Sequence, residues 1–287
     1  MTLEVAFQMD HISTIDIRTD STYLLALEAQ NRGYNVLHYQ VHDLFLEENL
    51  LFANTQKLTL NENSNNFFEL KEKKRTRLST VDVIMMRQDP PFNMQYITAT
   101  HLLEKIQSEV FILNNPRSVR NSPEKLFVTE FSELMPPTLI SSDDNEVLKF
   151  REKYKDIILK PLYGNGGESI IRIKRDDENF SSILEMFRKM YKESIVIQKF
   201  IPSISEGDKR IILLNGEILG SINRIPPQGE IRANMHVGAK PKKSKLTDKE
   251  IQICDIISPV LKKNKLYLAG IDVIGGEYLT EINVTSP

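Results

Sequence analysis

Three oxygen-bearing side chains near the end of the chain have a spacing that suits a hard cation. Asp272, Glu281 and Asn283 flank Gly275-Gly276, a pair typical of a two-residue hairpin turn. Side chains alternate between faces along a strand, so in such a hairpin Glu281 and Asn283 share the face of Asp272. Mg²⁺ prefers oxygen ligands and often also takes substrate phosphates. A polar, solvated sheet face is the alternative, but the flanking Ile, Leu and Val residues favour the metal site.

A glycine-rich segment, KPLYGNGGES at residues 160–169, could bind a phosphate. Gly164, Gly166 and Gly167 would let backbone N–H groups approach an anion closely. Lys160 ends the strand that precedes them, where a cation could meet the same anion. The segment matches neither the GxxxxGK[ST] nor the GxGxxG pattern. A flexible hairpin turn explains these residues equally well, so the pattern leaves both interpretations open.

Further charged residues could join this site, although a single Lys or Arg is more often simply solvated. Lys125 opens a helical stretch after a proline. In a strand beginning at residue 208, Asp208 and Arg210 would share one face and Lys209 would point the other way. Residues 226–241 form a long polar stretch that suits a lid, from which Arg232 and Asn234 could reach a ligand.

Other polar features favour ordinary structural roles. The basic run KEKKRTR at residues 71–77 predicts a solvated loop. The histidines at 11, 38, 42, 101 and 236 show no metal-ligand spacing. Cys254 lies in an apolar helical pattern, which favours an inert buried thiol over a nucleophile.

The elements that must position these residues fall into two patterns. Strand-like segments at 3–9, 36–39, 81–86 and 110–113 alternate with helical segments after residue 20 and at 94–107, which predicts a parallel α/β domain over residues 1–122. Prolines at 116 and 123 mark the boundary. Beyond it, strands at 156–160, 170–174 and 194–200, a helix at 180–191, hairpin turns at Asn215-Gly216 and Gly275-Gly276, and a helix at 248–263 predict an α+β arrangement.

Composition limits the class of protein. The chain has 287 residues, enough for about two domains. A net charge of −2 argues against a general nucleic-acid binder, and a single cysteine excludes an internal disulfide. Neither a signal peptide nor an apolar run long enough for a membrane helix is present, which favours the cytoplasm.

Several sequence blocks together resemble the bacterial glutathione synthetases of the ATP-grasp superfamily. They are MRQDPPF near residue 90, PEKLF at 123–127, ILKPLYGNGGESI at 158–170, EGDKRI at 206–211, RIPPQGEIRAN at 224–234 and LTEINVTSP at 279–287. The resemblance covers essentially the whole chain. It implies an N-terminal pre-ATP-grasp open α/β domain (1–122), then a two-subdomain ATP-grasp fold with a nucleotide lid (123–203) and a metal and substrate subdomain (204–287).

The same resemblance implies roles for individual residues. For ATP it implies phosphate contacts from Lys125 and Lys160 beneath the loop Gly164, Gly166 and Gly167, adenine recognition by Gln198, Lys199, Phe200 and Ile201, a ribose contact from Asp208, and a further contact from Asn234. It implies that Asp272, Glu281 and Asn283 bind Mg²⁺ or Mn²⁺, in agreement with the hairpin argument. It implies catalytic roles for Arg210, Arg224 and Arg232, and substrate binding by Arg224 and Ser286.

The implied activity is ATP-dependent joining of glycine to γ-glutamylcysteine through an acyl phosphate, giving glutathione, ADP and phosphate. The implied partners are these small molecules and further copies of the chain, as a dimer or tetramer, with no nucleic acid or membrane. The family typically continues for another helix after the TSP triplet, whereas this sequence stops at Pro287. An inactive ATP- and metal-binding protein is therefore one alternative that stays open. An ATP-grasp ligase with another amino-acid acceptor is a second, because the identity of the substrate rests on the resemblance and not on the spacing of residues.

Overall fold

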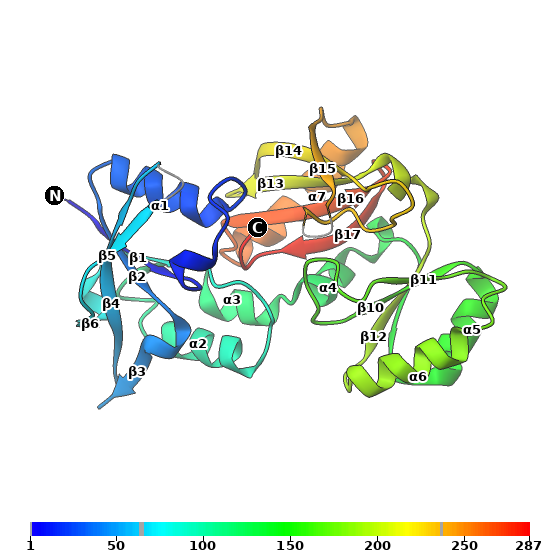
Figure 1. Ribbon diagram of the computed structural model, residues 1–287, viewed down its shortest axis with the longest axis horizontal. Coiled ribbons are helices and arrows are strands. Elements are labelled where there is room, and N and C mark those ends of the chain that lie inside the picture. Colours follow the sequence, from blue (N-terminus) through cyan, green and yellow to red (C-terminus); the bar gives the residue numbers. More distant parts are fainter. Residues whose placement is uncertain (1, 63–65, 236–237) are drawn as a thin grey trace. The chain divides into compact units, whose positions relative to one another are not determined.

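The computed structural model describes residues 2–62, 66–235 and 238–287, which form two compact units. The first unit contains residues 1–122, 261–269 and 283–287, and the second contains residues 123–260 and 270–282. Figure 1 shows the elements of the first unit mainly in blue and cyan, and those of the second in green to red. Among the described residues, no helix is long and apolar enough to cross a membrane.

The first unit is built on a mixed sheet with three helices. Its strands are β1 (Glu4–Gln8), β2 (Asn35–Tyr39), β3 (Leu44–Glu47), β4 (Leu50–Leu60), β5 (Phe68–Leu70), β6 (Lys74–Arg77), β7 (Val83–Met86) and β8 (Phe111–Leu113), and its helices are α1 (Ser21–Asn31), α2 (Met94–Glu104) and α3 (Pro116–Asn121). The order β2-β1-β7-β8 is parallel throughout, as the alternation of strands and helices predicts. Asp20 caps α1 by accepting a hydrogen bond from the Tyr23 N–H, the N-cap expected from its residue type.

The prediction of a purely parallel sheet is wrong at one side. The long strand β4 pairs antiparallel with β2, β3, β5 and β6. The basic run at 71–77, expected as a loop, contributes β6 from Lys74 to Arg77. Its side chains remain largely exposed, so the basic residues are solvated as expected while the backbone pairs. Charged side chains of this kind are common on strands at the margin of a sheet.

The second unit carries two smaller sheets. Its elements are α4 (Glu124–Phe127), β9 (Thr138–Ser141), α5 (Asp144–Tyr154), β10 (Ile157–Pro161), β11 (Ile171–Ile173), α6 (Phe180–Met190), β12 (Ile195–Lys199), β13 (Asp208–Leu214), β14 (Glu217–Ile225), β15 (Lys240–Lys243), α7 (Asp248–Lys263), β16 (Leu268–Ile274) and β17 (Tyr278–Asn283), the last three extending into the first unit. Short 3₁₀ segments lie at Ile12–Thr14, Val41–Asp43, Leu78–Thr80, Val128–Leu134 and Pro202–Glu206.

The antiparallel sheet β11-β10-β12-β9 is covered by α5 and α6 (Figure 1). Val147 from α5 and Phe187 from α6 pack with Leu159 in one buried core. Across the sheet, Ile158 pairs with Arg172 on one side and with Gln198 on the other. Directly opposite residues share a face, so these three side chains lie on the same side of the sheet.

The second sheet has the order β15-β14-β13-β16-β17. The two predicted hairpin turns are present, with positive φ at both central residues: 49° and 74° at Asn215-Gly216, and 62° and 66° at Gly275-Gly276. That combination defines type I′ turns, whose twist matches the flanking strands. The predicted helix at 248–263 is α7, and its apolar side includes the buried Cys254.

The predicted lid over residues 226–241 differs from the structure at its end. Lys240 and Pro241 belong to β15, which pairs with β14. A strand rich in Lys and Pro is tolerated because it lies at the edge of the sheet. His236 is outside the described residues.

Candidate functional site

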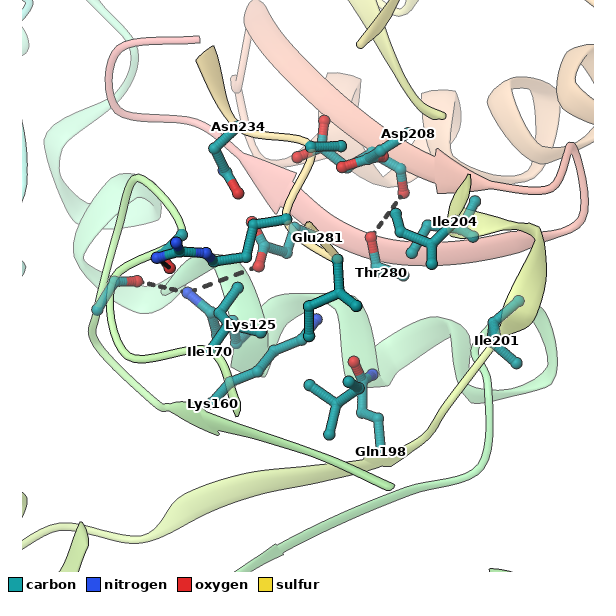
Figure 2. A pocket seen from close by; sticks show the side chains of 18 of the residues that line it. Lys125, Lys160, Ile170, Gln198, Ile201, Ile204, Asp208, Asn234, Thr280 and Glu281 are labelled. Carbon is teal, nitrogen blue, oxygen red and sulfur yellow. Dashed lines mark hydrogen bonds and ion pairs between the residues drawn. The ribbon is translucent and has the colours of Figure 1, made fainter. Parts of the chain in front are cut away.

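A cleft opens in the second unit, between residues of its two sheets. Both polar and apolar side chains line it, and both sheets contribute (Figure 2). Its lining includes these residues predicted from the sequence: Lys125, Lys160, Gly164, Gly166, Gly167, Gln198, Lys199, Phe200, Ile201, Asp208, Arg232, Asn234, Asp272 and Glu281.

Asp272 is held by two arginines that stand behind the cleft lining. Arg210 approaches it with two nitrogens, Nε at 2.5 Å from Oδ1 and Nη2 at 2.9 Å from Oδ2. Arg224 Nη2 lies 3.0 Å from Asp272 Oδ1. Burial alone would raise the pKa of Asp272, but the two guanidinium groups lower it to about 2. Asp272 is therefore a carboxylate at neutral pH.

Asp208 shares Arg224 with Asp272. Arg224 Nη2 donates to Asp208 Oδ2 at 2.5 Å, while Asp208 Oδ1 is buried with no hydrogen-bond partner. Burial raises the pKa of Asp208 to about 7, and the nearby charges of Asp272 and Glu281 add to that shift. An orphaned buried carboxylate oxygen is costly in the free protein. It is an acceptor that a hydroxyl group or a cation could satisfy.

Lys125 is held between carboxylates and the glycine-rich segment. Its Nζ lies 2.5 Å from Glu124 Oε1, 2.5 Å from the Gly164 carbonyl oxygen and 3.7 Å from Glu281 Oε1. Figure 2 shows Lys125 beside Glu281, with a dashed line for their ion pair. Burial acts to lower the pKa of Lys125, but Glu281 and Glu124 raise it above the usual value. Lys125 is thus a buried, fully charged ammonium group.

Lys160 enters the cleft from the end of β10, as its position in the sequence predicts (Figure 2). It is only 9% exposed, and burial lowers its pKa despite the attraction of Glu281, Asp208 and Asp272. Burial therefore disfavours its charge in the free protein. An anion in the cleft would offset that cost.

Buried ionisable groups of both kinds are concentrated here. The basic ones are Lys125, Lys160, Arg210 and Arg224, and the acidic ones are Glu124, Asp208, Asp272 and Glu281. Glu124 was not identified from the sequence; its only signal was its place beside Lys125. Burial and the nearby Glu281 charge raise the pKa of Glu124.

The chemistry of these oxygens fits a divalent cation. Within the described residues, no group of three or more His, Cys, Asp or Glu side chains is arranged as a metal site. The predicted set is different, because it combines two carboxylates with an amide. The Asp272 carboxylate already pairs with two cationic guanidinium groups. The nearby Asp208 has one carboxyl oxygen without a hydrogen-bond partner. A divalent cation bound together with a polyphosphate would take these oxygens as ligands. The arginines and lysines that now pair with the carboxylates could then contact the phosphates.

The glycine-rich segment is packed against the 226–241 stretch. Gly167 has φ of +81°, and a Cβ built there would lie 2.4 Å from Asn234 Oδ1. Gly164 has no positive φ, but a Cβ built there would lie 2.4 Å from Pro161 Cγ. Arg232 Nη1 reaches the Gly167 carbonyl at 3.5 Å and pairs with Glu230 through Nη2 at 2.6 Å. A side chain would therefore be strained by the backbone at Gly167 and would collide with Pro161 at Gly164.

Apolar side chains form the rest of the wall. Ile158, Ile204 and Ile274 line the cleft together with Phe200 and Ile201, and none of the three isoleucines was identified from the sequence. Gln198 donates from Nε2 to Thr138 Oγ1 at 2.9 Å, which fixes its side chain at the floor of the cleft. A mainly apolar wall with a fixed amide, called the slot below, suits an aromatic ring.

Two predicted residues belong to the first unit. Asn283 is the last residue of β17, two positions after Glu281. Ser286 donates from Oγ to Asp89 Oδ1 at 2.6 Å. Nearby in this unit, the buried Arg87 donates to Thr22 Oγ1 at 3.0 Å and to Ser21 Oγ at 2.7 Å.

Asp208 makes the stability of the protein depend on pH. Below about pH 4 the carboxyl group is protonated in both folded and unfolded chains. Between there and about pH 7 the folded chain keeps the proton that the unfolded chain loses, so stability falls as pH rises. We expect the melting temperature of Asp208→Asn, minus that of wild type, to become more positive between pH 5 and pH 8. Thermal unfolding across that range measures it, and a difference that is flat or opposite in sign would contradict the assignment.

Family models match both parts of the chain. Residues 3–120 match the N-terminal domain of prokaryotic glutathione synthetase, and residues 124–287 match the ATP-grasp domain of the same family. The glutathione synthetase of Agrobacterium fabrum is 50% identical over 283 residues, covering 99% of this chain and 88% of that protein. The glutathione synthetase of Brucella melitensis is 50% identical over 287 residues, covering 100% and 92%.

A solved structure agrees on the fold. The crystal structure of D-cycloserine synthetase matches with a TM-score of 0.67 at 12% identity, covering 99% of this chain and 92% of that one. At that identity the likeness concerns the fold alone. Together with the family models, it confirms the predicted fold class: an N-terminal α/β domain followed by an ATP-grasp domain.

Proposed function

Because the chain belongs to the prokaryotic glutathione synthetase family, we propose that it joins glycine to γ-glutamylcysteine at the expense of ATP, giving glutathione, ADP and phosphate. The observation that carries this proposal is identity of about half of all residues to glutathione synthetases over nearly the whole chain. The cleft supports it, because it combines an apolar slot with buried cations.

The cleft suits ATP from end to end. The base would lie in the slot formed by Gln198, Lys199, Phe200 and Ile201, and Asp208 would accept a hydrogen bond from the ribose. The phosphates would then meet Lys125 and Lys160 below the glycine-rich loop of Gly164, Gly166 and Gly167. Asn234 would close over them, since its side chain already packs on Gly167.

The reaction needs charge stabilisation more than covalent chemistry. The carboxylate of γ-glutamylcysteine attacks the terminal phosphorus of ATP, and the bond to ADP breaks. The glycine amine then attacks the acyl carbon, loses a proton and expels phosphate. Arg210, Arg224 and Arg232 would stabilise the negative charge that develops in both steps. Arg224 and Ser286 are the proposed contacts for the peptide substrate.

Asp272, Glu281 and Asn283 would hold the divalent metal that the family uses with ATP, and we propose Mg²⁺, with Mn²⁺ able to replace it. Such an ion neutralises charge between phosphate oxygens when it is bound. The chain's own contribution is to present carboxylates at neutral pH, which the low pKa of Asp272 provides. In the free protein, Arg210 and Arg224 balance that carboxylate.

Three further proposals concern the cellular context. Because the reaction consumes ATP, we place the enzyme in the cytoplasm. We also propose a dimer or tetramer, as the family resemblance implies, which light scattering after size-exclusion chromatography would test. The small molecules named above are the proposed partners, with no nucleic acid and no membrane.

The first experiment measures phosphate release from ATP and Mg²⁺ with γ-glutamylcysteine, with and without glycine. We expect release to require both substrates and glutathione to appear in equal amount. ATP binding by calorimetry without any release would instead indicate a nucleotide-binding protein without ligase activity. Release that another amino acid supports better than glycine would indicate a ligase of different acceptor specificity.

A further inference from the structure

Arg172 lies against a wall residue of the cleft. Its guanidinium carbon is 3.6 Å from the centre of the Phe200 ring, close to the shortest distance at which a cation can stack on an aromatic face. Phe200 lines the cleft, whereas Arg172 is absent from the lining found among the described residues. The arginine therefore stacks on the ring without being part of the cleft lining.

Asp156 anchors both partners of this stack. Its carboxylate holds Arg172 through two hydrogen bonds, from Nε at 2.9 Å and from Nη2 at 2.5 Å. Its backbone carbonyl accepts a hydrogen bond from the Phe200 N–H at 2.9 Å. The planar fork of Arg172 is thereby fixed in orientation, and so is the backbone of the residue on which it stacks.

The sheet places this group beside the base slot. Arg172 on β11 lies opposite Ile158 on β10, which lies opposite Gln198 on β12. Ile158 and Gln198 both line the cleft, so Arg172 emerges from the cleft face of the sheet, in the same row as the fixed amide. Ile158, Gln198 and Phe200 are thus three wall residues, and Arg172 stacks on the last of them.

We propose that Arg172, fixed by Asp156, is a positioning residue for the adenine base: it holds the Phe200 ring in the wall of the slot and thereby sets the affinity for the nucleoside part of ATP. The proposal rests on the proposed function only in taking an adenine nucleotide as the ligand of this cleft. An unsupported phenyl ring would sample several orientations, and binding would have to select the one that fits the base.

The test compares two substitutions at Arg172 with a matched control. Arg172→Met keeps an apolar stem and removes the cation, while Arg172→Lys keeps the charge and loses the flat fork. Arg151→Met is the control, because Arg151 stacks on Phe180 at 4.3 Å in the same unit, and neither residue lines the described cleft. Affinities for ADP and for adenosine, measured by calorimetry with displacement, are compared with KM for ATP and kcat.

We expect Arg172→Met to weaken ADP and adenosine by the same factor, about fivefold, with an equal rise in KM for ATP and kcat within about twofold. Arg172→Lys should lie between this variant and wild type, and Arg151→Met should bind as wild type does. Unchanged binding in Arg172→Met would overturn the proposal. So would a loss for ADP without one for adenosine, or an equal loss in the control.

Stability and function are separated in the same experiment. Thermal unfolding shows whether each variant is folded at the assay temperature. If Arg172→Met is unfolded there, the affinities of Arg172→Lys test the proposal. If wild type binds ADP without ligating glycine, the proposed function fails. The affinities of the Arg172 variants for ADP and adenosine still test the positioning role.

Discussion

Replacing Asp272 with Asn is expected to lower the kcat of ligation by about a thousandfold, at the upper end of what single charge-stabilising groups contribute. The change keeps the shape of the side chain and removes its charge. Asp272 contacts both Arg210 and Arg224, so the substitution would disturb two proposed catalytic cations and one proposed metal ligand together. The kcat is obtained from ADP formation at saturating substrates.

Stability must be followed in parallel. Asp272 is 2% exposed, and taking one partner from a buried ion pair typically costs about 3–5 kcal/mol. Activities are therefore compared at a temperature at which circular dichroism shows the variant to be folded. Asp255→Asn, which removes an exposed carboxylate on α7, is the control and should behave as wild type.

A second variant separates a metal role from a purely structural one. Glu281→Gln removes a proposed metal ligand that has a weaker contact, since Lys125 Nζ lies 3.7 Å away. Both Asp272→Asn and Glu281→Gln should need a higher Mg²⁺ concentration for half-maximal activity. Activity within about tenfold of wild type, with an unchanged Mg²⁺ requirement, would refute the metal assignment.

Local periodicity explains why part of this site was predictable. Asp208 and Arg210 point to the cleft side, where both interact with Arg224 or Asp272, while Lys209 pairs with Glu250 at 2.7 Å on the other side. That division follows from the period of a strand and needs no knowledge of the fold. The two type I′ turns were predictable for a similar reason, because few residue pairs accept positive φ twice in succession.

Long-range contacts explain what was missed. Arg210 meets Asp272 across 62 positions of sequence, and no spacing rule shows that β13 and β16 are neighbours. The burial of Glu124 likewise depends on Glu281 and Lys125 meeting in the folded chain. Among the strands paired with β4, only β6 (KRTR) is polar enough to resemble a loop; β4 itself alternates buried and more exposed residues, a strand pattern that the prediction overlooked. Tertiary packing, rather than local preference, decides such segments.

Replacing Lys160 with Met is expected to weaken ADP binding about a hundredfold while raising the melting temperature. The first effect is the loss of a buried charge-assisted contact with phosphate. The second follows from the pKa of Lys160, which burial lowers more than the neighbouring carboxylates raise it. A cation whose charge is disfavoured in the folded state destabilises the free protein, and methionine fills the same space without that charge.

Lys125→Met is the matched comparison, because this lysine has the opposite electrostatic balance. Glu281 and Glu124 raise its pKa, so its charge stabilises the folded chain. We expect a similar loss of ADP affinity but a lower melting temperature. Calorimetric titration gives the ADP affinity of each variant, and thermal unfolding gives its melting temperature. If both melting temperatures change in the same direction relative to wild type, the two lysines do not differ in the way described here.

The pH dependence gives an independent check on Lys160. The unfolded chain keeps its proton up to about pH 10.4, whereas the folded chain releases it earlier. Stability of wild type therefore rises with pH in that interval, relative to Lys160→Met, which has no such group. The melting temperature of Lys160→Met minus that of wild type should be largest near neutral pH and should decrease at alkaline pH. A phosphate that binds Lys160 should keep this lysine protonated, so with ADP bound the decrease should begin at a higher pH.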